Sequence, residues 1–355
     1  MEKKASIWSL RLHIRTQSVR VLFWCRLPAA AEGQGSYPPV DRLVKTERSA
    51  KLAALLRWSV TLICIGLVVA YHIYRNRDDI ALVSAPDWST LSLSWILGLT
   101  GCLVLPLILQ GMLREHGFGL SYRDSFVLHA LPQIGKYLPG KVWSVAGAWI
   151  LAGRFQVPRD VMVACWTFST AAICIAGALV GFPVFRADVS LVVPIAALFI
   201  VSLWFVYPGL NLFLRLLGRT QLPSKVRTER LLIATAWATL SWLIQGLGFA
   251  VLVSSYAPLD LELGAYCVAL YGISIVAGFL ALFAPGGLGV REAVLFTALS
   301  PALGPGLSTM LALVARIWHF SLEACLAVVG WLMLKKCNPV SDRSAPSPIE
   351  EDDNA

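Results

Sequence analysis

The stretch Ala284-Pro-Gly-Gly-Leu-Gly-Val-Arg-Glu292 interrupts a long apolar segment with a proline, three glycines and a pair of charges. A second and shorter interruption reads Lys136-Tyr-Leu-Pro-Gly-Lys141. Proline removes a backbone donor and glycine loosens the chain, so a helix ends or kinks at each stretch. Irregular backbone at membrane depth requires a covering of protein or a watery cavity, and paired breaks are typical of a transporter's binding site. Two cytoplasmic loops with ordinary turn residues are the alternative.

The composition indicates a membrane protein. Hydrophobic residues make up 57% of the chain and charged residues 14%, whereas soluble domains hold about 25% charged residues. Of the 30 Lys and Arg, ten lie in residues 1–51 and five in 215–230. Basic clusters beside membrane spans mark the cytoplasmic side and attract anionic lipid. We do not expect nucleic-acid binding, because no basic motif with interleaved aromatic residues lies outside the membrane body.

The cysteines and histidines give no indication of a metal or cofactor. The eight cysteines are scattered without a Cys-x-x-Cys pair, and there are only five histidines. Most of the cysteines lie in apolar windows, where cysteine behaves as a small hydrophobic residue. We therefore expect no metal site, no cofactor and no disulfide framework.

The apolar windows predict an all-α, polytopic helical bundle, because a span needs about 20 apolar residues. Six full spans are expected: about 53–74, 91–113, 161–185, 189–214, 231–256 and 307–334. Two further segments, 126–155 and 264–303, contain the Pro-Gly breaks and are possible re-entrant hairpins.

The charge pattern predicts the orientation. The basic residues of 1–51, Arg114, Arg123 and 215–230 favour the cytoplasm, as do Lys335 and Lys336, so both termini are expected on the cytoplasmic side. The membrane is expected to be the plasma membrane, which is the inner membrane of a bacterium. With two hairpins, the half-repeats 52–185 and 189–334 read span, span, hairpin, span in opposite orientation. Such an inverted repeat is common among secondary transporters. Two full crossings at 264–303 would satisfy the same charges.

Three regions are expected. Residues 1–51 form a basic cytoplasmic arm, 52–336 the transmembrane domain, and 337–355 an acidic disordered tail. The alternative for the arm is that translation starts nearer residue 43.

The last predicted span carries three polar residues on one helical face. Arg316 and Glu323 lie two turns apart, about 10.5 Å along the helix, with His319 between them. A charge at a helix centre costs about 2.5–3.5 kcal/mol on insertion scales. These residues therefore line a pathway or form a buried salt-bridge network that holds helices together.

The residues at the breaks suggest a phosphate site. A half-helix beginning near Gly289 directs free N–H groups at the cavity, and Arg291 adds a cation. The four expected substrate-binding cations are Lys141, Arg154, Arg291 and Arg316. The expected pairing or coupling groups are Glu292, His319 and Glu323, and the helix-break residues are Pro139, Gly140, Pro285, Gly286 and Gly287. For Lys136, and as the alternative for Arg154, snorkelling of the side chain to the interface is expected.

These motifs carry a resemblance. Tyr137-Leu-Pro-Gly-Lys141 with Gly153-Arg154, and Pro285-Gly-Gly-Leu-Gly-Val-Arg-Glu292 with Arg316, resemble the lysylphosphatidylglycerol synthase transmembrane region family over roughly residues 50–336. That family includes the flippase domain of the bacterial multiple peptide resistance factor. The resemblance implies a stand-alone member. Lipid lysylation is not implied, since nothing after the last span resembles the factor's aminoacyl-transferase domain.

Three functions follow as hypotheses. The first is a flippase that moves an anionic phospholipid or a polyprenyl-phosphate-linked lipid between leaflets, with the lipid as partner. The second is a membrane-embedded enzyme acting on a lipid phosphate, for which Glu292, His319 and Glu323 would supply acid–base groups. The third is a scaffold for a separate synthase or glycosyltransferase. No catalytic constellation is found, so transport is preferred over catalysis. The sequence leaves the lipid, its direction of movement, the energy source and the oligomeric state open.

Overall fold

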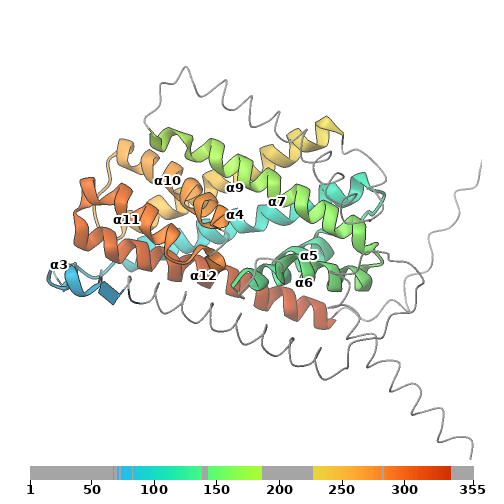
Figure 1. Cartoon of the computed structure of the whole chain (residues 1–355), viewed down its shortest axis with the longest axis horizontal. Helices are drawn as coiled ribbons and strands as arrows, with labels where there is room; N and C mark the ends of the chain where they lie inside the picture. The colour runs from blue at the N-terminus through green and yellow to red at the C-terminus, as the bar shows by residue number, and fades with distance from the viewer. Residues whose placement is uncertain are drawn as a thin grey trace, which may run out of the picture. The chain divides into compact units, whose positions relative to one another are not determined.

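The computed structural model describes residues 83–137, 143–185, 227–281 and 284–336, with Leu67 and most of 70–81. All of them belong to one unit of the chain, Trp58–Ala355. Every regular element in this part of the chain is a helix (Figure 1). The protein is therefore all-α over the described residues, as the sequence predicts.

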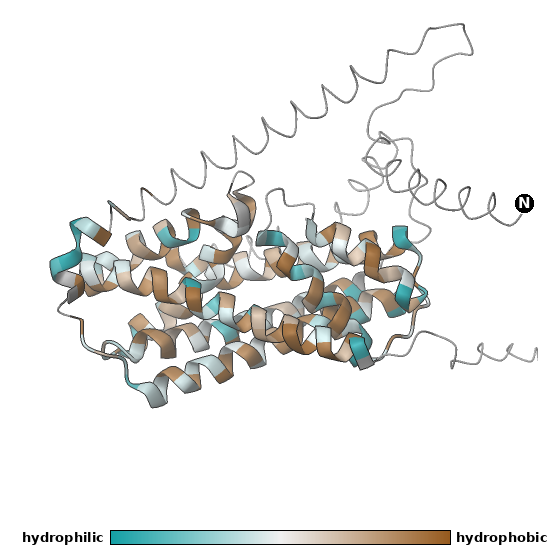
Figure 2. Cartoon of the chain, turned by 90° about the horizontal axis from the view of Figure 1, so that it is seen from below, coloured by the Kyte–Doolittle hydropathy of each residue, from teal (hydrophilic) through white to brown (hydrophobic). Residues whose placement is uncertain are grey.

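Five described helices are long and apolar enough to cross a membrane. They are α4 (Trp88–Glu115), α7 (Arg159–Gly181), α9 (Thr228–Ser254), α10 (Leu261–Leu280) and α12 (Pro305–Lys336). Hydrophobic residues dominate the long helices, while hydrophilic residues gather mainly toward the ends of the bundle (Figure 2). These helices make the chain a membrane protein.

Four of the expected spans correspond to long helices. The segments 91–113, 161–185, 231–256 and 307–334 correspond to α4, to α7 with the short η4 (Phe182–Phe185), to α9 and to α12. The span expected at 189–214, the arm 1–51 and the tail 337–355 lie outside the described residues, as does most of 53–74. Helix α10 belongs to the segment 264–303, for which a hairpin and two full crossings were both left open, and its 20 residues are enough to cross.

The two interrupted segments have unequal halves. In the first, α5 (Tyr122–Gln133) leads through η2 (Ile134–Tyr137) toward α6 (Trp143–Ala152) and η3 (Gly153–Phe155). Helices α5 and α6 have 12 and 10 residues, about 18 and 15 Å, so neither alone crosses a core of about 30 Å.

In the second interrupted segment, α10 is followed by η5 (Pro285–Gly287) and by α11 (Val290–Leu303), which has 14 residues. The longer halves here are not matched in the first segment. The inverted repeat and the re-entry of either segment remain predictions.

The centre of the bundle depends on close helix contacts. Helix α4 lies along α9, which also packs on α7 and α10, while α12 lies against α11 and α5. A Cβ on Gly101 of α4 would lie 2.5 Å from Cγ of Gln245 on α9, and one on Gly272 of α10 would lie 3.0 Å from the carbonyl oxygen of Gly177 on α7. Small residues allow helix backbones to approach closely, which matters in a membrane because the hydrophobic effect does not drive helices together there.

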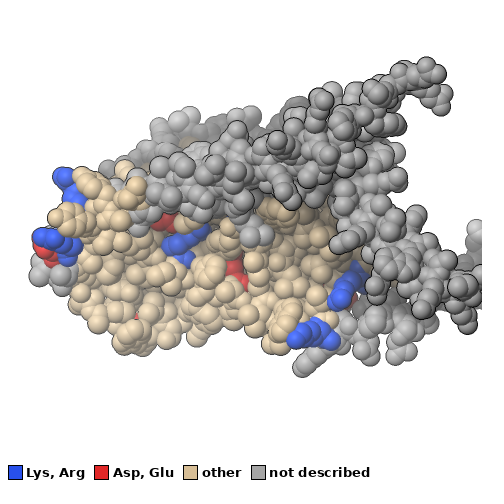
Figure 3. Space-filling model, turned by 60° about the horizontal axis from the view of Figure 1, so that its bottom comes forward, with Lys and Arg blue, Asp and Glu red and all other residues tan. Residues whose placement is uncertain are grey.

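Many of the described charges lie near the ends of the long helices. The Asp87 amide, just before α4, donates to the carbonyl oxygen of Ser255 after α9 over 2.9 Å. At the other end, Glu115 of α4 pairs with Arg227 and Arg230 beside the start of α9. The two helices are thus antiparallel. Figure 3 shows a mostly uncharged face with basic groups toward its ends and a small group of mixed charges between them.

Candidate functional site

The second break is built from left-handed glycines. Gly286 has φ 57° and Gly289 has φ 82°, a region that side-chain-bearing residues rarely adopt. The Gly289 amide donates to Oε2 of Glu292 over 2.7 Å, so Glu292 caps the start of α11. A Cβ on Gly286 would lie 3.0 Å from Cδ1 of Tyr137 and 3.1 Å from Nη2 of Arg316. The break is therefore packed directly against two side chains from other elements.

Arg316 of α12 holds this break. Its Nη1 donates to the carbonyl oxygen of Gly286 over 2.8 Å and lies 3.4 Å from Oε1 of Glu292. The guanidinium carbon is 5.7 Å from the centre of the Tyr137 ring, within reach of a cation–π interaction. One cation thus satisfies a carbonyl freed by the break and neutralises the carboxylate that caps α11.

Glu323, two turns further along α12, joins the first break to the bundle. It forms an ion pair with Lys136 Nζ, and the Tyr137 hydroxyl donates to its Oε2 over 2.7 Å. His319 Nε2 lies 3.1 Å from Oε1 of Glu323, and its Nδ1 lies 2.7 Å from the Tyr271 hydroxyl. A neutral His319 that carries its proton on Nε2 satisfies both contacts, donating to Glu323 and accepting from Tyr271.

Arg291, which follows the second break, differs from these paired charges. It is only 5% exposed, and its Nε has no hydrogen-bond partner. Its guanidinium interacts with the Tyr271 hydroxyl and lies close enough to Arg316 for their charges to repel. No ion pair joins Arg291 to a carboxylate within the described part of the chain, so it is a buried cation without a counter-charge there.

The complete arrangement is called the break network below: Lys136, Tyr137, Tyr271, Arg291, Glu292, Arg316, His319 and Glu323. Its three permanent cations face two carboxylates, which leaves one positive charge uncompensated among these residues. The 3₁₀ turns η2 and η5 contact each other, so the two breaks meet although about 150 residues of chain separate them.

The structure places most of the expected site residues. Arg316, His319 and Glu323 share one face of α12 and belong to the break network, as do Arg291 and Glu292. Arg316 also donates to the Gly286 carbonyl. Arg154 lies in η3 and is exposed, and within the described residues no hydrogen bond or ion pair joins it to the network. Lys141, Pro139 and Gly140 lie outside the described residues.

The interpretation of Lys136 was wrong. We expected it to snorkel to the interface, but its ammonium pairs with Glu323. Tyr137 and Tyr271 were not considered as network residues. The signal for Tyr137 was its position beside Lys136 in the break motif, and for Tyr271 it was a hydroxyl in the middle of an apolar helix, which needs a partner when buried.

No family model matches the sequence, and no curated protein matches it either.

Proposed function

We propose that this membrane protein is a flippase-like transporter that moves an anionic phospholipid or a polyprenyl-phosphate-linked lipid between leaflets. The observation that supports it is the buried, uncompensated guanidinium of Arg291 at the second helix break. A charge at membrane depth is costly and usually serves a pathway or a partner. An anion bound beside Arg291 would supply the missing counter-charge.

Phosphate is the anion that the chemistry favours. A guanidinium presents a planar fork that matches phosphate oxygens, and Arg291 lies in the first turn of α11, the end of a helix that attracts anions. Arg316 contacts the same break, so two cations converge there. A lipid headgroup could reach this network while its tails remain in the membrane, because the Lys136 side chain is 30% exposed.

The resident acids would act as counter-ions between transport events. Glu323 holds Lys136, and Glu292 holds Arg316. A phosphate that takes over one of these cations releases a carboxylate, which then needs a proton or another partner. Glu292, His319 and Glu323 are accordingly proposed as pairing or coupling groups, and Arg291 and Arg316, with Lys141, as substrate ligands.

The test is a leaflet-resolved lipid assay in proteoliposomes. Chain-labelled phosphatidylglycerol should become accessible to an impermeant quencher faster with the parent protein than with Arg291→Gln. Arg77→Gln is the matched control, since Arg77 is exposed and paired with Asp78 in α3 (Arg77–Ala81). Parent rates no higher than those of empty vesicles would refute the flippase.

The same vesicles separate the alternatives. A covalently altered lipid, detected by mass spectrometry after extraction, would point to the membrane-embedded enzyme acting on a lipid phosphate. If the lipid is neither moved nor covalently changed, the remaining hypothesis is a scaffold for a separate synthase or glycosyltransferase. Movement without covalent change is the outcome that we expect.

Whether Lys141 and Arg291 share one phosphate is tested by combining Lys141→Gln with Arg291→Gln. A charge-assisted contact contributes about 1.5–3 kcal/mol, so each single change should weaken anionic-lipid binding about ten-fold or more. Two cations on one headgroup should give a non-additive loss in the double variant. Single variants that bind like the parent would make the breaks architectural only.

A further inference from the structure

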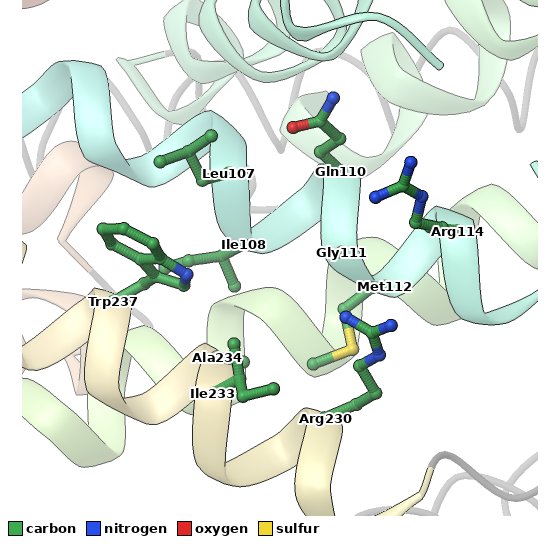
Figure 4. A pocket seen from close by; sticks show the side chains of 10 residues that line it. All are labelled: Leu107, Ile108, Gln110, Gly111, Met112, Arg114, Arg230, Ile233, Ala234 and Trp237. Atoms are coloured by element: carbon green, nitrogen blue, oxygen red, sulfur yellow. The ribbon is translucent and has the colours of Figure 1, made fainter. Parts of the chain in front are cut away.

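A groove between α4 and α9 lies outside the break network. It has a volume of about 180 Å³ and is lined by one face of each helix. Figure 4 shows Arg114 and Arg230 at one end of this groove, and Leu107 and Trp237 at the other. Seven residues separate the two ends on each helix, which is about 10 Å of rise. The groove is thus a short apolar channel that ends at two arginines.

The arginine end carries a surplus of positive charge. Arg230 Nε lies 3.1 Å from Oε2 of Glu115, and Arg227 pairs with the same carboxylate. The side chain of Arg114 is exposed and makes no hydrogen bond or ion pair within the described residues. Glu229 also lies near Arg227, so three cations against two carboxylates leave this end with one surplus positive charge that can attract an anion.

The apolar end is suited to a hydrocarbon chain. Ile233 and Trp237 are 46% and 39% exposed, yet they belong to a helix that can cross a membrane, where such side chains contact acyl chains. Gly111 forms part of the groove wall, and a Cβ placed on it would meet nothing within 4 Å. The missing side chain at this position keeps the groove open.

We propose that this groove binds one anionic glycerophospholipid, with its phosphate on Arg114 and Arg230 and the first part of an acyl chain between Leu107 and Trp237. Basic pockets between membrane helices are suited to anionic headgroups, and charge-assisted contacts from arginine to phosphate are strong. The site uses no residue of the break network and does not rest on the proposed transport.

The test uses the purified full chain in detergent and phosphatidylglycerol whose acyl chains carry bromine, a short-range quencher of tryptophan fluorescence. The signal of Trp237 is obtained as the difference between a protein and its Trp237→Phe counterpart. We expect brominated phosphatidylglycerol to quench this signal at a concentration at least about ten-fold lower than brominated phosphatidylcholine, since a single charge-assisted contact already gives a difference of this size.

Two substitutions examine the two ends of the groove separately. Arg114→Gln should reduce the affinity for phosphatidylglycerol about ten-fold, toward that for phosphatidylcholine, while Arg230 still contacts the phosphate. Gly111→Leu should abolish quenching by both lipids, because the leucine fills the groove. The matched control is Gly264→Leu in α10, where a Cβ also meets nothing within 4 Å.

Three results would overturn the proposal. One is equal quenching by the two lipids in the parent. Another is parent-like quenching in both Arg114→Gln and Gly111→Leu. The third is full competition by soluble glycerol phosphate at the lipid's own concentration, which would mean an anion site without an acyl-chain groove.

Discussion

The carbonyl oxygen of Gly286 accepts a hydrogen bond of 2.8 Å from Nη1 of Arg316. Gly286 stands in the middle of the second break, with a left-handed backbone, so its carbonyl has no helical partner to satisfy it. A side chain of α12 therefore supplies the hydrogen-bond donor that the interrupted backbone does not provide. Arg316 and Arg291 both lie at this break, yet their surroundings predict opposite effects on stability.

Arg316→Gln is expected to destabilise the protein. The side chain is 15% exposed and holds both Gly286 and Glu292, and removing one partner of a buried pair costs about 3–5 kcal/mol. The free energy of unfolding in mixed micelles would measure this loss. Because the two groups interact, the loss in Arg316→Gln/Glu292→Gln should be smaller than the sum of the single losses. Strict additivity would mean that the pair is not formed.

Arg291→Met should leave the lipid-free protein as stable as the parent or more stable. Replacing a buried charge by an apolar residue of similar shape is often neutral or favourable by about 1–4 kcal/mol, and methionine keeps the stem that packs on Gly278. The melting temperature would be recorded with and without phosphatidylglycerol. The parent should gain stability from this lipid, whereas Arg291→Met should gain less. A large loss in the absence of lipid would show that Arg291 has a counter-charge after all.

Tyr137→Phe tests the contact between the first break and α12. The substitution removes only the hydroxyl that donates to Glu323, and a hydrogen bond to a charged group contributes about 1.5–3 kcal/mol. Tyr266→Phe is the control, because the Tyr266 hydroxyl makes no hydrogen bond within the described residues, so this substitution should change stability by less than about 0.5 kcal/mol. Equal effects of the two substitutions on the free energy of unfolding would contradict the role of Tyr137.

The topology can be tested by cysteine labelling. Asp87 is hydrogen-bonded to Ser255, so the segments before α4 and after α9 lie at the same end of the bundle. With both termini cytoplasmic, an impermeant thiol reagent applied from outside should label Ser84→Cys and Pro258→Cys above the background of the native cysteines. Gly119→Cys should react only from inside. Labelling of position 258 from the inside alone, or a reporter after Lys336 that is active only outside, would reverse the predicted orientation.

Acid should loosen the first turn of α4. Hydrogen bonds from the side chains of Thr90 and then Ser89, with the Ser89 amide, lower the pKa of Asp87 below its ordinary value of 3.8. A depressed folded-state pKa means that this stabilisation is complete above 3.8 and is lost as the pH falls through the lower folded value. Hydrogen exchange of the α4 first-turn amides should therefore accelerate at low pH relative to Asp87→Asn, which caps the helix without titrating. Identical pH profiles in the two proteins would exclude the carboxylate.

Sequence reasoning found the long helices and the face of α12 because both depend on local patterns. Apolar length predicts a span, and helical periodicity alone places Arg316, His319 and Glu323 together. The same reasoning misassigned Lys136, because its choice between the interface and Glu323 depends on how η2 packs against a helix 187 residues away. It left the segment 264–303 open between a hairpin and two full crossings, because the apolar residues run on toward the Pro285 break without a charge that marks the end of α10. The positive φ angles at Gly286 and Gly289 fit the predicted break, but no pattern in the sequence reveals that this break touches Tyr137.

The contact between α10 and the second break has a consequence for how related sequences can differ. A Cβ on Gly287 would fall 2.7 Å from Cα of Gly278, and a Cβ on Gly278 would fall 2.5 Å from Cγ of Arg291. A side chain at position 278 would therefore displace both the break and the buried cation, and one at 287 would push α10 away. In an alignment of homologues, positions 278 and 287 should both remain glycine wherever an arginine occupies position 291. Sequences that lack one of these three residues should also carry substitutions at the other two.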